Sequence, residues 1–157
     1  MKLNTKYGMV VSGHKTATKA GMKVLRKGGN AMDAAIATAA TLAVVIPNMN
    51  GLGGDSIALW YDAKKNKVSV INGSGKSPLK ASKKYFKSRG LKNIPQRGPL
   101  SISTPGVVHA WDTALKKYGK KNFNEILKDA INFAEKGFVV DKYLKNFFEG
   151  KVYQSLI

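Results

Sequence analysis

Apolar and polar positions near the start of the chain predict a strand and then a helix. Met9–Ser12 (MVVS) is a short apolar run that ends in a small residue, which is typical of a buried strand. A helix is expected after His14, with Thr16 as its N-cap. Its apolar face would consist of Ala17, Ala20, Val24 and Leu25. Gly28-Gly29 should end this helix, because glycine is favoured just past a helix C-terminus.

The next segment predicts a buried helix. Asn30 is its expected N-cap, and Asp33 stands three residues later in a capping-box position. The stretch from Ala31 to Ile46 is rich in alanine and apolar almost all round, so most of its sides should be buried. Pro47 ends it, and further breakers follow at Asn48, Asn50, Gly51 and Gly53. The apolar run is therefore shorter than the roughly 20 residues that a membrane span needs.

A hairpin is expected in the middle of the chain. Ser56–Tyr61 and Val68–Ile71 have the composition of strands, and the polar link Asp62–Lys67 (DAKKNK) is short enough to make them antiparallel. Glycine-rich loops lie before and after this pair. Ala81 to Leu100 is rich in lysine and weakly patterned, which indicates a surface helix and loop.

The last third predicts three helices. Thr104-Pro105 would provide an N-cap and a first-turn proline. Apolar residues then follow at helical spacing until Gly119: Val107, Val108, Trp111, Ala114, Leu115 and Tyr118. Asn122 and Glu125 should open a second helix that ends at Gly137, and Asp141 should cap a third. With no repeat and no evident linker, residues 1–157 are expected to form a single α/β domain, with Trp111 and the phenylalanines in its core.

Composition excludes several chemistries. The 157 residues include no cysteine and only two histidines, His14 and His109. We therefore expect no disulfide, no metal site and no cofactor. The first residues, Met1 to Tyr7, are polar and carry lysine, so no secretory signal is expected, and we predict a cytoplasmic protein without a membrane partner.

The formal net charge of +18 has two interpretations. Blocks of basic residues could bind nucleic acid through phosphate contacts. The other interpretation, which we favour, is a solvated lysine-rich surface. Only three of the 27 basic residues are arginine, the side chain best suited to reading bases and phosphates.

Four segments resemble the gamma-glutamyltransferase family in order and spacing. Ser12–Asn30 runs into a Gly-Gly-Asn-Ala-x-Asp-Ala-Ala pattern that ends at Ala35. Gly51–Gly54 (GLGG) resembles the family's glycine loop before a sheet strand, and Thr104-Pro105-Gly106 resembles the opening of a family helix. Gly137–Val140 (GFVV) is the fourth match. Within this frame, His14 is expected to form local hydrogen bonds and His109 to be structural. For Gly51–Gly54, roles in packing and in substrate approach both remain open.

The resemblance implies part of an αββα four-layer sandwich, the fold of N-terminal-nucleophile hydrolases. It also implies autocatalytic cleavage, which frees a threonine whose own amine activates its hydroxyl for attack on gamma-glutamyl amides such as glutathione. Relatives include cephalosporin acylases and a capsule transpeptidase. The family's Thr-Thr-His cleavage segment does not occur in this sequence, so we expect the chain to supply no catalytic residue.

The resemblance places one substrate contact within the chain. Family members carry an arginine after the second hairpin strand that grips the substrate α-carboxylate. Ser74 stands at that position here, between Gly73 and Gly75, and Lys76 follows. Bidentate recognition of the substrate carboxylate is thereby lost. We expect Ser74, Gly75 and Lys76 to bind a gamma-glutamyl or related amide through hydrogen bonds and a point charge.

The expected partner is the rest of the large-subunit sequence together with a small subunit that carries the threonine. The chain would then be the N-terminal segment of a large subunit, and inactive alone. A piece of a longer protein, a gene remnant and one part of a split protein all remain open. The alternative function is a non-catalytic basic module that binds nucleic acid or a partner chain.

Overall fold

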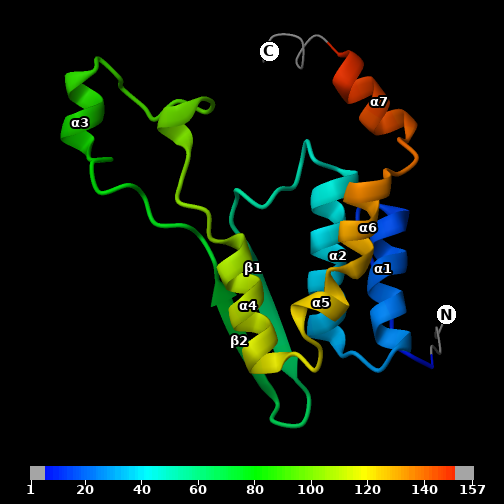
Figure 1. Ribbon diagram of the computed structural model, residues 1–157. Helices are drawn as coiled ribbons and strands as arrows, with labels where there is room; N and C mark the ends of the chain where they lie inside the picture. The colour runs from blue at the N-terminus through cyan, green and yellow to red at the C-terminus, as the bar shows by residue number, and fades with distance from the viewer. Residues whose placement is uncertain (1–5, 151–157) are drawn as a thin grey trace, which may run out of the picture. The chain divides into compact units, whose positions relative to one another are not determined.

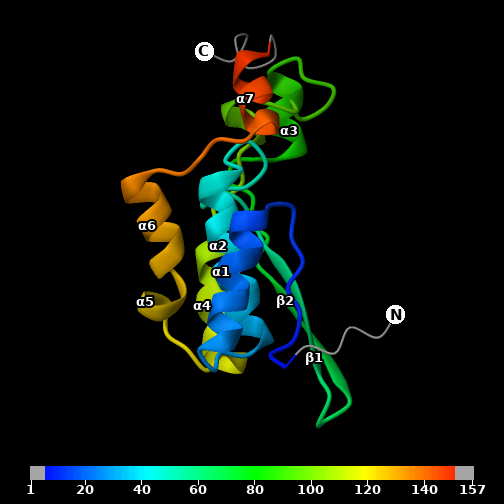
Figure 2. The same cartoon turned by 90° about the vertical axis from the view of Figure 1, so that its right-hand side faces the viewer.

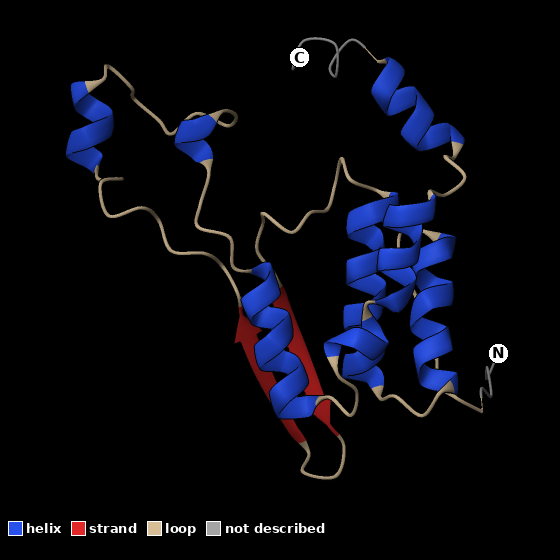
Figure 3. Cartoon of the chain, in the orientation of Figure 1, coloured by secondary structure: helices blue, strands red, loops and turns tan. Residues whose placement is uncertain are grey.

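The computed structural model describes residues 6–150, which form α-helices, one short 3-10 helix and a two-stranded sheet (Figures 1 and 3). The chain divides into two compact units. Unit 1 comprises Met1–Gly51 and Asp112–Ile157, and unit 2 comprises Leu52–Trp111. The second boundary lies inside helix α4 (Val107–Tyr118). The single domain expected for residues 1–157 stays a prediction.

Unit 1 is built around two neighbouring helices, α1 (Lys15–Arg26) and α2 (Ala31–Val45). The two helices pack against each other, and α6 (Lys128–Lys136) also contacts α2 (Figures 1 and 2). A Cβ atom built on Gly21 of α1 would lie 2.2 Å from Oγ1 of Thr38 in α2. Only glycine permits this approach between the two helices.

The buried helix expected at Ala31–Ile46 is confirmed as α2. Most of its side chains are buried, including two threonines that satisfy their hydroxyl groups within the helix. Thr38 donates to the carbonyl of Ala34, and Thr41 donates to the carbonyl of Ala37. Because each hydroxyl has a partner, these polar groups can be buried without a large desolvation penalty.

The helix ends agree with the sequence at three N-caps. Asn30 and Asn122 each form the expected capping box, with Asp33 and Glu125 respectively, and Asp141 caps α7 (Lys142–Glu149). The N-cap expected at Thr16 is wrong. The cap of α1 is His14, whose Nδ1 accepts a hydrogen bond from the backbone N–H of Thr16 at 3.2 Å. The ring nitrogen of His14 thus has the capping role that was expected of the Thr16 hydroxyl oxygen.

Two further expectations for unit 1 are wrong. Met9–Ser12 is not a strand, and the side chains of Met9 and Val11 are exposed. A strand needs a hydrogen-bonded neighbour, and within residues 6–150 no other segment pairs with this one. The single helix expected after Asn122 is instead two, α5 (Phe123–Ile126) and α6, separated at Leu127.

Unit 2 contains the expected hairpin, which is confirmed. β1 (Ile57–Asp62) pairs antiparallel with β2 (Lys67–Asn72), and Leu59 lies opposite Val70. The surface helix and loop are also present, as α3 (Lys83–Ser88) and the 3-10 helix η1 (Pro99–Ser101).

The start of α4 differs from the expectation. Thr104 and Pro105 precede the helix, which begins at Val107. The carbonyl of Gly54 accepts hydrogen bonds from the N–H groups of Gly106 and Val107, at 3.0 and 3.1 Å. Because a backbone carbonyl already satisfies these first donors, no side-chain cap at Thr104 is needed.

The core of the described residues is made mainly of aliphatic side chains and Trp111, which is buried as expected. The phenylalanines are not core residues. Phe148 is exposed, and the other phenylalanines in residues 6–150 are only half-buried. The aliphatic residues that do fill the core lie largely on α2 and α4.

Candidate substrate-binding loop

The candidate site is the loop that leaves β2, which carries Ser74, Gly75 and Lys76. Gly73 extends the hairpin by one hydrogen bond, because its N–H donates to the carbonyl of Ser56 at 2.8 Å. The chain then turns, and the N–H of Ser74 donates to Oδ1 of Asn72 at 3.0 Å. Ser74 and Lys76 are exposed, whereas Gly75 is half-buried. Both polar side chains of the site are therefore accessible to a ligand.

Glycine at three positions allows this loop to lie directly against the segment that opens α4. A Cβ atom on Gly75 would lie 1.4 Å from the carbonyl oxygen of Thr104, and one on Gly106 would lie 2.2 Å from that of Gly73. A Cβ atom on Gly73 would lie 2.3 Å from the Cβ of Ala110. These backbones approach closer than any side chain allows. The N–H of Thr104 also donates to the carbonyl of Lys76 at 3.1 Å, which fixes the far end of the loop.

The glycine loop Gly51–Gly54 contacts the start of α4 through one backbone carbonyl. Gly54 has a structural role, since its carbonyl receives the first N–H groups at the start of α4. Around Gly51 and Gly53, in contrast, a Cβ atom would meet nothing within 4 Å. Close packing therefore does not require glycine at Gly51 or Gly53, and the roles of packing and of substrate approach in this loop stay predictions.

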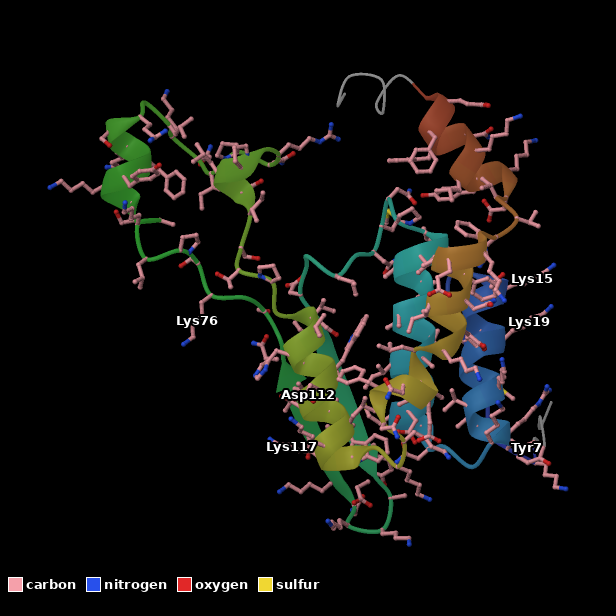
Figure 4. All side chains as sticks on the ribbon, in the orientation of Figure 1. Tyr7, Lys15, Lys19, Lys76, Asp112 and Lys117 are labelled. Carbon is pink, nitrogen blue, oxygen red and sulfur yellow. The ribbon has the colours of Figure 1, made fainter. Side chains whose placement is uncertain are left out.

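The loop has the chemistry of a weak anion site. Lys76 contributes a single flexible ammonium group, and Figure 4 shows its side chain extending away from the ribbon. Ser74 contributes one hydroxyl group that can donate or accept. Together they can hold a carboxylate, but they lack the two parallel N–H donors with which an arginine would fix its orientation.

The two histidines stand outside this loop. His14 forms local hydrogen bonds, as expected, and its Nε2 lies 3.6 Å from Oδ2 of Asp141. His109 is an exposed residue of α4. The structural role expected for it on the apolar stripe is not supported, because its ring is outside the core.

Sequence reasoning assigned Asp33 only to a capping box and missed its second role. The fully buried carboxylate also accepts hydrogen bonds from the N–H groups of Lys120 and Lys121. The side-chain amide of Asn30 donates to the carbonyl of Tyr118. One signal was available in the sequence, since an aspartate within an otherwise apolar helix needs a partner when it is buried.

Other kinds of site find no support in residues 6–150. No group of three or more His, Asp or Glu side chains in this range could hold a metal ion. Among the same residues, no helix has both the length and the apolar character needed to cross a membrane.

Comparison with known proteins agrees with this picture. The gamma-glutamyltranspeptidase family model matches residues 17–155. The glutathione hydrolase-like YwrD proenzyme of Bacillus subtilis is 46% identical over 133 residues, which cover 84% of this chain and 25% of that protein. The chain thus spans about a quarter of the length of this relative.

Solved structures show the same relationship. The gamma-glutamyltranspeptidase of Helicobacter pylori superposes with a TM-score of 0.86 at 34% identity, covering 95% of this chain and 43% of that one. The cephalosporin acylase of Bacillus halodurans gives a TM-score of 0.77 at 30% identity, covering 98% and 33%. The expected fold, an incomplete part of this architecture, is confirmed. Sequence and structure together show that the chain belongs to the gamma-glutamyltranspeptidase family.

Proposed function

We propose that this chain is the first part of a gamma-glutamyltransferase-like enzyme and that it forms one wall of the acyl-donor site. The observation that carries the proposal is the position of the Ser74–Lys76 loop. It follows β2 directly and is fixed by backbone contacts of Gly73, Gly75 and Gly106. A rigid loop with an accessible hydroxyl and an accessible cation is suited to binding the carboxylate of a donor.

The nucleophile would come from a second polypeptide segment whose N-terminal residue is threonine. Its hydroxyl attacks the amide carbonyl of the donor, its own amine takes the proton, and the amine product leaves. Water or an amine acceptor then releases the acyl group. In this scheme the chain contributes binding, and no residue of it touches the reacting bond.

The donor would be a gamma-glutamyl or related amide. The relatives named as glutathione hydrolases make glutathione the first donor to test. Ser74 and Lys76 offer a weaker and less directional grip on an α-carboxylate than an arginine does. We therefore propose that this site tolerates donors that lack the full α-amino-acid head group.

The test is complementation. The full chain is co-expressed with the rest of the YwrD proenzyme, and release of p-nitroaniline from gamma-glutamyl-p-nitroanilide is followed. Turnover is expected from the co-purified complex and not from the chain alone. A partner in which alanine replaces the N-terminal threonine is the control and should be inactive. A purified complex that shows no turnover with any gamma-glutamyl amide contradicts the proposal.

The alternative function, nucleic acid binding, has one supporting observation. Lys15 and Lys19 follow one another along α1, and both side chains extend away from the helix in Figure 4. Exposed lysines bind phosphates in a salt-dependent way. Gel shifts with DNA and with RNA at low salt test it, and the absence of a shift with both excludes this function.

A further inference from the structure

Asn72 is the last residue of β2 and directly precedes the candidate loop. Its Oδ1 accepts the hydrogen bond from the backbone N–H of Ser74, at 3.0 Å. This bond distinguishes the two ends of the side-chain amide, because only the oxygen can accept from an N–H group. The orientation of the amide relative to the loop is therefore set by the loop itself.

The amide nitrogen of Asn72 keeps two hydrogen-bond donors for a ligand. Within residues 6–150, the bond from Ser74 to Oδ1 is the one hydrogen bond of this side chain, and Nδ2 donates to no protein group. Asn72 is exposed, so a ligand can reach these N–H groups. Because Nδ2 is bonded to the same carbon as Oδ1, it is held close to the backbone of Ser74.

Burial alternates from the end of β2 into the loop. Gly73 is buried and Gly75 is half-buried, and their Cβ positions face Ala110 and the carbonyl of Thr104 respectively. The residues that alternate with these glycines are exposed: Asn72, Ser74 and Lys76. Successive residues of an extended chain point to opposite sides. The three polar residues therefore form one row on the side away from the segment that opens α4.

The chemistry of this row suits a carboxylate. The amide of Asn72 and the hydroxyl of Ser74 can each donate to one carboxylate oxygen, and the ammonium group of Lys76 supplies the opposite charge. An arginine provides two N–H donors from one side chain. In this chain, two neighbouring side chains can provide the two donors instead.

From this arrangement we infer that Asn72 is a third carboxylate-binding residue of the acyl-donor site and determines its selectivity for substrates that carry an α-carboxylate. The inference rests on the function proposed above. Oδ1 accepts from the loop while Nδ2 donates to the substrate. One side chain thus both positions Ser74 and binds the ligand.

Asn72→Asp separates binding from positioning. The aspartate keeps an oxygen that can accept from the N–H of Ser74, but it loses the amide N–H groups and adds a negative charge. The variant is made in the full chain and co-expressed with the rest of the YwrD proenzyme, in which alanine replaces the N-terminal threonine. Isothermal titration calorimetry then measures binding to the purified complex without any need for turnover.

Two amides that differ in one group are compared. Gamma-glutamyl-p-nitroanilide should bind at least about tenfold more weakly to the Asn72→Asp complex, since a hydrogen bond to its α-carboxylate is lost and a like charge is added. The second amide, 4-aminobutyryl-p-nitroanilide, lacks only the α-carboxylate, and its affinity should not fall. Asn93→Asp is the matched control, because Asn93 is another exposed asparagine of unit 2. It should leave both affinities unchanged.

Three results would overturn the inference. The first is an unchanged affinity of the Asn72→Asp complex for gamma-glutamyl-p-nitroanilide, and the second is a wild-type complex that does not bind this amide. The third is an equal loss of affinity for both amides, which would assign Asn72 to positioning of the loop alone. Retained binding of the 4-aminobutyryl amide, together with an unchanged circular dichroism spectrum, shows that the variant is folded.

Failure of this inference differs from failure of the proposed function. Turnover is measured separately, with the threonine intact in the partner. Binding that Asn72→Asp weakens selectively, without any turnover by the wild-type complex, supports the role of Asn72 and contradicts the function. Turnover by the wild-type complex, with binding that Asn72→Asp leaves unchanged, supports the function and contradicts the role of Asn72.

Discussion

The carboxylate of Asp33 accepts a hydrogen bond from the backbone N–H of Lys120, whose nitrogen lies 3.0 Å from Oδ1. The N–H of Lys121 donates to the same oxygen at 3.2 Å, and the N–H of Asn30 donates to Oδ2 at 2.8 Å. The carboxylate is fully buried, so these donors replace its lost hydration. The Asn30–Asp33 motif therefore connects the start of α2 to the turn after α4 through hydrogen bonds.

Loss of the hydrogen bonds to the Asp33 carboxylate should destabilise the chain. Asp33→Ala leaves part-buried backbone N–H groups without their acceptor and removes the capping box of α2. We expect a loss of about 2–4 kcal/mol in the free energy of unfolding, measured by urea denaturation. Asp112→Ala is the control, since Asp112 forms a partly exposed pair with Lys116 and should cost less than about 0.5 kcal/mol. Equal effects of the two substitutions would show that the hydrogen bonds of Asp33 do not contribute to stability in this way.

The approach of α1 to α2 at Gly21 gives a second prediction. Gly21→Ala would improve helix propensity by about 1 kcal/mol in an exposed helix. Here the added methyl group would lie 2.2 Å from Oγ1 of Thr38 and 3.0 Å from the carbonyl oxygen of Ala34. The cost of overpacking should exceed the gain in helix propensity, so the free energy of unfolding should fall by roughly 1–3 kcal/mol. Gly53→Ala, which meets nothing within 4 Å, should change the thermal midpoint little. A Gly21→Ala variant that is more stable than the wild type would contradict the packing argument.

Features that depend on neighbouring residues could be predicted from the sequence. The caps at Asn30, Asn122 and Asp141 require only a polar side chain and the N–H groups of the next turn. The hairpin required two apolar runs and a short polar link. The burial of α2 followed from its lack of a polar face.

Features that depend on distant residues could not be predicted in this way. The start of α4 is set by the carbonyl of Gly54, about fifty residues earlier. The strand expected at Met9–Ser12 required a partner segment, and periodicity alone says nothing of one. In the candidate site, the resemblance located Ser74 and Lys76, but the glycine contacts that fix their loop appear only in the structure. The role of Ser74, Gly75 and Lys76 in binding stays a prediction.

Glu125 gives a prediction about pH. A hydrogen bond from the ammonium group of Lys121, at 2.9 Å, is the main cause that holds the pKa of this carboxyl below its ordinary value of 4.5. The N–H of Asn122 adds to the effect. Since the pKa is lower in the folded state, the contribution to stability is present above pH 4.5 and is lost as the pH falls through the folded pKa.

Titration of the Glu125 carboxyl by NMR checks this directly. The pKa should be below 4.5 in the wild type and should rise in Lys121→Ala, which removes the main hydrogen bond. Lys145→Ala is the control, because Lys145 pairs with Glu149 on α7 and should leave the Glu125 titration unchanged. A wild-type pKa at or above 4.5 would contradict the assignment.

The last prediction concerns the choice of donor in the reconstituted enzyme. If Lys76 contacts the donor carboxylate, Lys76→Ala should lower kcat/KM for gamma-glutamyl donors by the equivalent of about 1.5–3 kcal/mol, the range for a hydrogen bond to a charged group. Lys80→Ala is the matched control, because Lys80 is another exposed lysine just beyond the loop. Ser74→Arg should act in the opposite direction, since a guanidinium group at this position restores bidentate carboxylate recognition. The exposed side chain of Ser74 leaves room for the larger residue. Steady-state kinetics with glutathione and with an amide that lacks the α-carboxylate should show that both substitutions change only the first donor. An unchanged kcat/KM for every donor with Lys76→Ala would mean that the loop does not bind substrate.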